Sequence, residues 1–473
     1  MNHKNKTTLK KSIRLKSRIK RWVLAGSIVL SGVMMAGCGY YGEAQIQYPE
    51  PIQTPIQMVT TTGATGETTN GLSGEATEES VVNRTGGNEV GKVTFTEEEL
   101  KRYHDLTADW AMKLLNKSYR EGEGNVLVSP LSVESAFMLA ANGAKDQTLE
   151  EILQLFWGEG NQKTEEELAF ANAFLSMYIN GIESSENGEV AVANSIWVNK
   201  EMGLTLQKDY ERSMKKLFDA EVEAVTFDEK TLKMVNKWCE THTAGQIKEI
   251  LSDMSPMDAM YLINAINFDA KWEEPYMPEQ VEDGEFTGAD GSKMPAKLMS
   301  SQERIYLNCK KGYGVERFYE NGFAFTALLP NEGVTVKELI ESLDGKAWTE
   351  MLDNPTYGEV YTKLPKFEFS GEYEMRDMLS EMGIGTAFSN DADFSGMINE
   401  DTSLQIDRVI HKTHIAVDEN GTKAAAATAL AMRCMALPQQ EVFHVDLDRP
   451  FVYAIIDTEM NLPIFIGVVE EIN

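Results

Sequence analysis

Along the C-terminal four fifths of the chain, apolar positions recur at helical spacing in some segments and alternate at strand spacing in others. The first helix is predicted to begin at a capping box, in which Thr96 and Glu99 lie three residues apart. A second helix is expected after the sequence "SPLS" at 129–132, and it should stop near Gly143. Residues 371–383 predict a third helix, whose methionine-rich stripe we interpret as core packing and whose final glycine should end it.

Strand-like segments lie between these helices. Four of them are rich in β-branched and aromatic residues, namely 190–199, 260–268, 323–330 and 410–417. Near the end of the chain, residues 450–457 and 462–469 are almost wholly apolar and are separated by a short polar turn, which predicts a hairpin buried on both faces. Helices and strands together indicate a mixed α and β domain.

The first residues of the chain have the pattern of an export signal. Nine basic residues and no acidic residue fall within 1–37, and the apolar run from Trp22 to Gly37 covers 16 residues, which is short for a membrane span and typical of a signal peptide. Small residues precede Cys38, as in a bacterial lipoprotein processing site, where Cys38 would receive lipid. A plain secretory signal or an uncleaved anchor is the alternative.

Residues 38–94 differ in composition from both neighbouring segments. Thr, Gly, Glu and Ser dominate, and no aromatic residue occurs between Tyr48 and Phe95, so this segment is predicted to stay disordered. As a random coil it would average roughly 40 Å from end to end. We therefore divide the chain into a signal peptide at 1–37, a lipidated tether at 38–94 and a folded domain at 95–473.

Charge and cysteine content argue against several classes of function. The chain has 44 basic and 74 acidic residues and a net charge of −30. Because nine of the basic residues belong to the signal segment, the rest is more acidic still, which argues against nucleic-acid binding. With Cys38 assigned to lipid, Cys239, Cys309 and Cys434 remain, an odd number that indicates no dense disulfide scaffold.

The residues do not assemble into a catalytic or cofactor motif. Of the six histidines, only His411 and His414 lie close together in the sequence. In a strand, residues three apart face opposite ways, which argues against a shared metal ion. Neither a nucleophile elbow nor a phosphate-binding loop occurs. We therefore expect no enzyme activity, no metal and no cofactor.

Several short motifs follow one another in an order that is hard to reach by chance. They are "SPLS" from Ser129, "NSIW" from Asn194, "NAINFDAKW" from Asn264, "LPKFEF" from Leu364, "VIHKTHIAVDENGTKAAAAT" from Val409, and "RPFVYAIID" with "PIFIG" near the end. In this order and spacing the chain resembles a serpin over about 95–473. The resemblance implies an α+β fold with three β-sheets, about nine helices and an exposed reactive-centre loop near the C-terminus.

The resemblance also implies an activity. Serpins trap serine proteases, and sometimes cysteine proteases: the protease cuts the loop and forms an acyl-enzyme, and the loop then inserts into the main sheet and carries the protease with it. By position, the family's hinge is matched by Glu419, Gly421, Thr422, Ala424, Ala425, Ala426 and Ala427. The remaining matches are the shutter residues Ser129, Ser132, Asn264 and His411, the tryptophan at the top of the sheet, Trp272, and the lysine that pairs with the hinge glutamate, Lys366.

The residues after Gly421 have the alternation that an inserted strand needs. Counted by twos, Thr422 begins a set of small or apolar residues, whereas the charged residues Lys423 and Arg433 both fall on the other face. The family's usual spacing from the hinge places the cleaved bond at Met435-Ala436, which suits elastase-, chymotrypsin- or subtilisin-like proteases. Arg433 is the alternative reactive residue and implies a trypsin-like target.

Two functions remain open at this point. The first is an inhibitor anchored to a membrane by its lipid, in the cell envelope and facing outside the cytoplasm, or released to the extracellular space. The second is a serpin that no longer inhibits and serves as a binding or structural module. Thr422 and the alanines favour inhibition, because serpins that do not inhibit tend to carry bulky, charged or proline residues in the hinge. We expect a monomer whose partners are a serine protease and a membrane.

Overall fold

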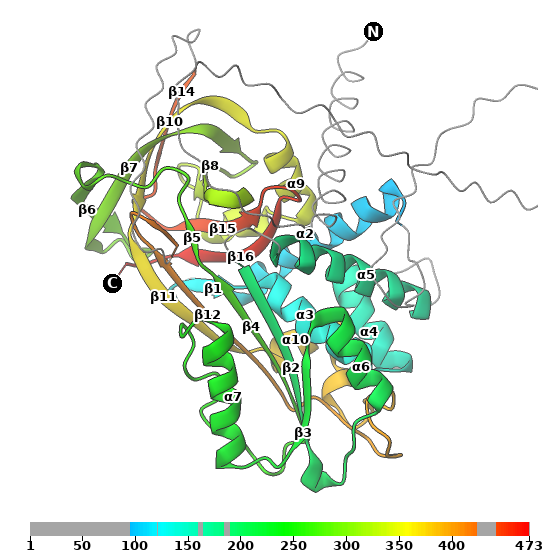
Figure 1. The fold of residues 1–473 in the computed structure, drawn as a ribbon. Coiled ribbons are helices and arrows are strands. Elements are labelled where there is room, and N and C mark those ends of the chain that lie inside the picture. The colour runs from blue at the N-terminus through cyan, green and yellow to red at the C-terminus, as the bar shows by residue number, and fades with distance from the viewer. Residues whose placement is uncertain (1–94, 121, 159–163, 184–189, 423–440, 473) are drawn as a thin grey trace, which may run out of the picture.

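The structure is a computed structural model that describes residues 95–120, 122–158, 164–183, 190–422 and 441–472 (Figure 1). In these ranges it contains nine α-helices and sixteen strands, which confirms the α+β class. No helix in the same ranges is long and apolar enough to cross a membrane.

The helices begin where the sequence predicts their caps. The Thr96 hydroxyl accepts a hydrogen bond from the Glu99 N–H at 3.1 Å, and the Glu99 carboxylate accepts from the Thr96 N–H at 2.8 Å. Ser129 caps the next helix by accepting from the Ser132 N–H at 3.2 Å. The α-helices are α2 (Glu97–Ser118), α3 (Pro130–Ala141), α4 (Asp146–Trp157), α5 (Thr164–Glu183), α6 (Lys208–Phe218), α7 (Glu229–His242), α8 (Val336–Glu341), α9 (Gly345–Asp353) and α10 (Arg376–Leu379).

The prediction of a helix over 371–383 is wrong for its first four residues. Residues up to Glu374 extend strand β11, which pairs with β12 along its whole length, so tertiary strand pairing prevails over local helix propensity. Helix α10 is therefore short, and Gly383 at φ 122° interrupts the turn that follows it. The interpretation of the methionines as core packing is confirmed, since Met375 is fully buried and Met378 and Met382 are partly buried against the core.

The strands predicted from alternation and β-branched content are confirmed within about two residues. The final hairpin, β15 with β16, is buried along its whole length as expected. The strands are β1 (Val126–Val128), β2 (Val190–Asn199), β3 (Glu221–Val225), β4 (Met260–Phe268), β5 (Ala270–Lys271), β6 (Val281–Thr287), β7 (Lys293–Asn308), β8 (Gly312–Phe318), β9 (Phe323–Pro330), β10 (Thr356–Pro365), β11 (Phe367–Glu374), β12 (Arg408–Val417), β13 (Gly421–Thr422), β14 (Val442–Asp446), β15 (Phe451–Asp457) and β16 (Leu462–Val469).

Hydrogen bonds join the described strands into two sheets. The nine-stranded sheet has the order β1-β16-β15-β9-β8-β7-β10-β14, with β6 also paired to β7. The seven-stranded sheet has the order β3-β2-β4-β12-β13-β5, with β11 also paired to β12. The expected three sheets are therefore two in the structure, because two of them are joined into the nine-stranded sheet. The joint is the 16-residue strand β7, which pairs with β6 and β10 along most of its length and with β8 at its end.

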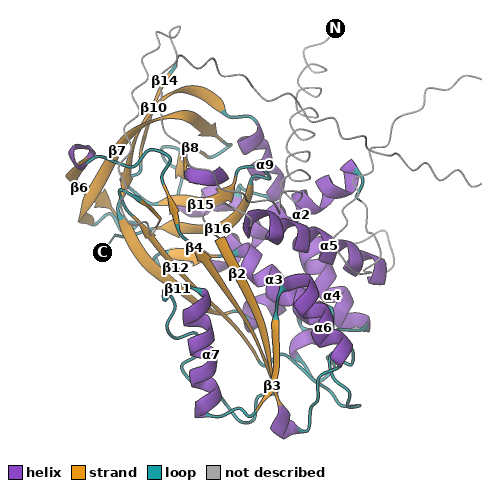
Figure 2. Ribbon diagram, in the orientation of Figure 1, coloured by secondary structure: helices purple, strands orange, loops and turns teal. Residues whose placement is uncertain are grey.

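The helices are divided unequally between the faces of the seven-stranded sheet. Figure 2 shows α3 to α6 gathered on one side of this sheet and α7 on the other. All 12 residues of α3 are buried, because this helix packs against both β4 and the hairpin strand β16. The first turn of α3 therefore lies under the middle of the seven-stranded sheet, where the predicted shutter residues are.

Candidate functional site

A seam divides the seven-stranded sheet between β4 and β12. The two strands run parallel, and their ladder covers only Arg408–Ile410 of β12 and Tyr261–Ile263 of β4. Farther along, β13 lies between the strands on either side of the seam, since Thr422 pairs with Val417 of β12 and with Ala270 of β5. In the described sheet, β4 and β12 form no ladder beyond Ile263 and Ile410, and β13 occupies the far end of this seam.

Polar side chains bridge the seam just beyond its short ladder. The Ser132 hydroxyl, on the first turn of α3, donates to the Asn264 side chain of β4 and lies 3.5 Å from Nδ1 of His411 on β12. The Ser129 N–H donates to His411 Nε2 at 3.0 Å, and the Ser129 hydroxyl donates to the Ile464 carbonyl at 2.8 Å. The structure thus brings all four predicted shutter residues into one buried network.

Burial keeps the imidazole of His411 uncharged. The side chain is enclosed, and desolvation lowers the pKa of His411 to about 3. Because Nε2 accepts the Ser129 N–H, the single ring proton belongs on Nδ1, which faces the Ser132 hydroxyl. A second proton would place a donor against a donor, so the network requires the neutral ring.

The residues predicted to form the hinge begin in a tight turn after β12. The Asp418 carboxylate accepts from the Asn420 N–H at 2.7 Å and from the Gly421 N–H at 3.3 Å. A Cβ atom on Gly421, whose φ is 156°, would collide with the carbonyl oxygen of Ala270 and come within 2.8 Å of the Lys271 Cα. Gly421 is therefore what lets the hinge lie directly against β5.

An aromatic cluster holds Thr422 in the sheet. Thr422 is buried, and its hydroxyl lies 2.6 Å from the Tyr319 hydroxyl. Tyr319 stacks on Trp272 with ring centroids 4.2 Å apart, and the Trp272 indole N–H donates to the Asp418 carbonyl at 2.8 Å. The Arg317 guanidinium lies over Trp272, 4.9 Å from the ring centroid. Trp272 thus bonds directly to the turn before Thr422, and Tyr319 and Arg317 pack around its ring.

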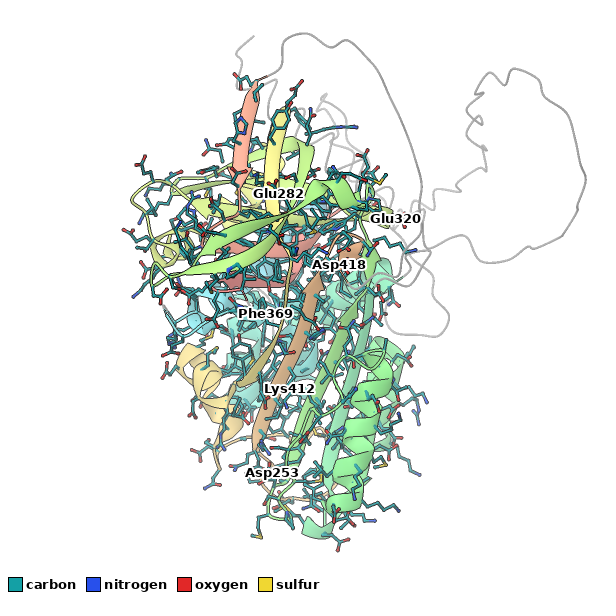
Figure 3. The ribbon with its side chains drawn as sticks, turned by 90° about the vertical axis from the view of Figure 1, so that its left-hand side faces the viewer. Asp253, Glu282, Glu320, Phe369, Lys412 and Asp418 are labelled. Atoms are coloured by element: carbon teal, nitrogen blue, oxygen red, sulfur yellow. The ribbon has the colours of Figure 1, made fainter. Side chains whose placement is uncertain are left out.

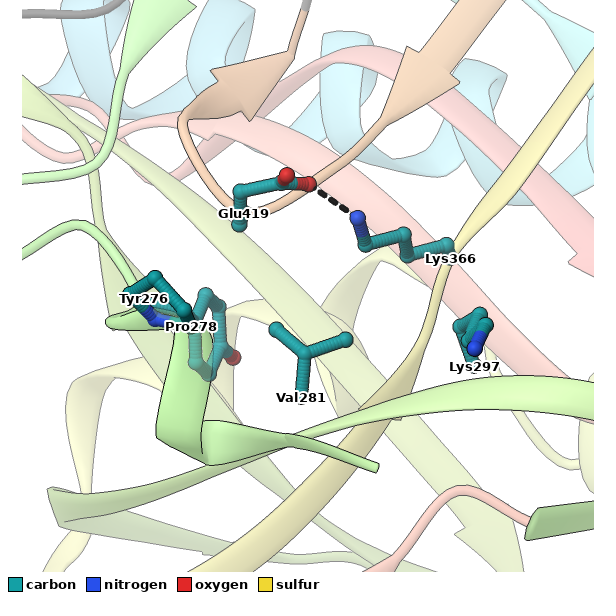
Figure 4. A pocket seen from close by; sticks show the side chains of 6 residues that line it. All are labelled: Tyr276, Pro278, Val281, Lys297, Lys366 and Glu419. Carbon is teal, nitrogen blue, oxygen red and sulfur yellow. Dashed lines mark ion pairs between the residues drawn. The ribbon is translucent and has the colours of Figure 1, made fainter. Parts of the chain in front are cut away.

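An ion pair between Lys366 and Glu419 ties the hinge turn to the junction of β10 and β11 (Figure 4). The hydrogen bond from the Lys366 amine lowers the pKa of Glu419. The pair is partly open to solvent, with side chains 29% and 38% exposed, so its contribution to stability is modest. It borders a cavity of about 310 Å³ that is also lined by Tyr276, Pro278, Val281 and Lys297.

Other predicted site residues lie outside the described residues, namely Ala424, Ala425, Ala426, Ala427, Arg433, Met435, Ala436 and Cys38. Tyr319 and Arg317 also belong to the aromatic cluster around Thr422, although no sequence pattern singled them out. They reach it only through the tertiary packing of β8 and the turn after it. No group of three or more His, Cys, Asp or Glu residues in the described part of the chain could hold a metal ion.

Comparisons with known proteins agree on one family. The family model described as "Serpin (serine protease inhibitor)" matches residues 105–472. Alpha-1-antiproteinase from Rattus norvegicus is 28% identical over 366 residues, covering 76% of this chain and 87% of the relative. An uncharacterised serpin-like protein from Thermococcus kodakarensis is 30% identical over 363 residues, covering 75% and 82%.

Among solved structures, the native state of the thermophilic serpin Tengpin superimposes with a TM-score of 0.74 and 33% identity, covering 83% of this chain and 100% of that one. The latent state of the same protein gives a TM-score of 0.68 at 32% identity, covering 79% and 98%. The fold described above is therefore shared with both structures, and the TM-score is higher for the native one.

Proposed function

The chain belongs to the serpin family, and on that premise we propose that it inhibits serine endopeptidases by suicide cleavage, acyl-enzyme trapping and insertion of the cut loop into the seven-stranded sheet. The observation that carries this proposal is the position of β13. Thr422 lies between β12 and β5, so a chain that continued antiparallel from it would run down the seam between β12 and β4. A strand inserted there gains hydrogen bonds on both sides.

The register of β13 supports this route. Thr422 is opposite Val417 in an antiparallel pair. Each further residue of an inserted strand would therefore pair one residue nearer the start of β12, and Ala429 would lie opposite Ile410. Up to that point the strand enters the part of the seam without a ladder. Insertion that reaches Ile410 must begin to separate the short ladder of β4 and β12, and the Ser132 bridge lies on the same path.

The free energy of insertion comes from new ladder bonds. Each contributes about 0.5–1.5 kcal/mol net, so a strand from Thr422 to Met435, about 46 Å long at roughly 3.3 Å per residue, would stabilise the cut form by on the order of 10 kcal/mol. Because the intact form lacks this gain, it must be held kinetically. The short seam ladder and its polar bridge are the barrier that we assign to this role.

We further propose that the cut occurs at Met435-Ala436, by an elastase-, chymotrypsin- or subtilisin-like protease, with Arg433 and a trypsin-like protease as the alternative. Lipid on Cys38 and the tether at 38–94 would hold the monomeric inhibitor at the outer side of a membrane. The composition of 1–94 supports the anchor, and the small side chains after Thr422 support the trap.

The test is a set of reactions of the folded domain with subtilisin, elastase and trypsin, analysed on denaturing gels. Inhibition predicts a complex with at least one protease that survives SDS, and mass spectrometry of the released C-terminal peptide would locate the cut. Cleavage by every protease without a complex, and with no gain in thermal stability of the cut chain, would favour the non-inhibitory alternative.

Two substitutions at neighbouring positions make this test specific for insertion. Thr422→Arg places a charge at a buried position and should turn the inhibitor into a substrate that is cut without forming the complex. Lys423→Arg, on the face that alternation assigns to solvent, should leave complex formation unchanged. Equal yields of complex from both variants would contradict the assigned route.

A further inference from the structure

Exposed apolar side chains gather on two neighbouring strands at one edge of the nine-stranded sheet. Tyr357 and Tyr361 of β10 are 60% and 41% exposed, and Val442 of β14 is 55% exposed. The other large apolar side chains that are comparably exposed in the described residues are methionines on other elements. We call Tyr357, Tyr361, Val442 and the exposed His444 the β10–β14 patch.

Contacts between β10 and β14 fix the position of two side chains of the β10–β14 patch. Tyr361 lies directly opposite His444 in the parallel pair, and their rings stack with centroids 5.6 Å apart. On the inner side of the same pair, the Thr362 hydroxyl donates to the Val445 carbonyl at 2.6 Å. Figure 3 shows both strands projecting at one end of the molecule, with side chains around them. Such aromatic groups lose little conformational entropy on binding and are typical anchors of protein interfaces.

The length of chain next to the patch indicates what can cover it. Strand β14 begins at Val442, directly after the segment that holds the expected cleavage site. From Ala436 to Val442 the chain can span at most about 20 Å when fully extended. A protease of about 220 residues has a radius of gyration on the order of 17 Å. The active site of a protease that holds Met435-Ala436 would therefore lie within about 20 Å of Val442, close enough for the body of the protease to reach the patch.

We propose that the β10–β14 patch is a secondary docking surface for the target protease, outside the loop that enters its active site. This inference rests on the proposed function. Tyr361 and Val442 would supply apolar contact, and the acidic groups beside them would select the partner: the Tyr361 hydroxyl donates to the Glu359 carboxylate at 3.3 Å, and Glu441 is exposed next to Val442. The protease that fits has an apolar and basic rim beside its active-site cleft.

The experiment measures the second-order rate constant for the SDS-stable complex, with whichever of subtilisin, elastase and trypsin reacts fastest. The double variant Tyr361→Ala/Val442→Ala should slow complex formation at least fivefold and leave the stoichiometry of inhibition unchanged, because the loop and the seam are intact. Glu359→Lys keeps the rings but reverses the charge, so it should slow the reaction severalfold and weaken its dependence on salt. Met257→Ala, 82% exposed before β4, is the matched control and should have no effect.

The outcomes separate this inference from the proposed function. If the wild-type chain forms no complex with any protease, the proposed function fails and the docking surface falls with it. If the complex forms but both patch variants react within twofold of the Met257→Ala control, only the docking surface is overturned. Sedimentation that shows a wild-type dimer and a monomeric Tyr361→Ala/Val442→Ala variant would assign the patch to a second copy of the chain and also overturn the proposal.

Discussion

Glu134 is a buried carboxyl on α3 whose replacement should make the domain more stable. Both of its carboxylate oxygens lack a hydrogen-bond partner within the described residues, and burial raises the pKa of Glu134 to about 8. Since the ordinary value is 4.5, the unfolded chain releases this proton at lower pH than the folded one does. The folded state therefore has its full stability below pH 4.5 and loses stability as pH rises toward 8.

The loss is about 1.4 kcal/mol per pH unit within this window, or on the order of 5 kcal/mol by pH 8. Glu134→Met keeps the shape of the side chain and removes the ionisable group. For a folded domain of about 370 residues, the entropy of unfolding is about 0.8 kcal/mol/K. The variant should therefore melt about 6 °C above the wild type at pH 8 and at nearly the same temperature at pH 4.5.

The assay is differential scanning calorimetry at one scan rate between pH 4.5 and 8.5. Glu167 is the matched control, because it is also buried but pairs with Arg102 at 2.7 Å and accepts from the Tyr103 hydroxyl at 3.2 Å. Glu167→Met should lower the melting temperature, since it leaves Arg102 unpaired. A gain for Glu134→Met that does not change with pH, or a loss at pH 8, would refute the reasoning.

Three further results are expected at the hinge and the seam. Gly421→Ala should displace β13 and shift tryptophan emission to the red as the aromatic cluster opens; unchanged emission would contradict the steric argument. In a double-mutant cycle of Lys366→Gln and Glu419→Gln, the coupling free energy of the ion pair should be below about 1 kcal/mol. This coupling should decrease as pH falls below the ordinary pKa of Glu419, because the carboxylate then takes up a proton. In the wild type, the free energy of unfolding should fall by about 1.4 kcal/mol per pH unit as pH falls from 6.5 toward 3, because only the unfolded His411 takes up a proton there. His411→Gln should remove this dependence. If the reasoning is wrong, urea unfolding at several pH values will give parallel curves of stability against pH for the two proteins.

Local sequence patterns predicted most elements because the local and tertiary preferences agree there. The strands 260–268 and 410–417 have β-branched residues at the positions that the sheet buries, and Thr96 and Ser129 are strong caps. Residues 371–374 are the exception, since their spacing fits a helix but β12 offers them a strand partner. Which preference prevails depends on a strand partner that lies 36 to 42 residues away in the chain.

The candidate site was predictable only through the order of its motifs. Nothing local to His411 or Ser132 indicates that they meet across a seam, and the spacing of residues cannot show that β4 and β12 share so short a ladder. The contacts of Tyr319 with Thr422 and Trp272 also arise from packing alone. The roles assigned to the hinge, the shutter and the cleavage site stay predictions until the trap is measured.

The most direct measurement of the central claim is the melting temperature of the domain after a protease has cut its loop. If the loop inserts into the seam, the new ladder bonds, on the order of 10 kcal/mol in total, should raise the melting temperature by about 10 °C or more. A cut chain that melts at or below the temperature of the intact chain, and whose residues after Thr422 show no protection from amide hydrogen exchange, would contradict insertion and with it the proposed mechanism.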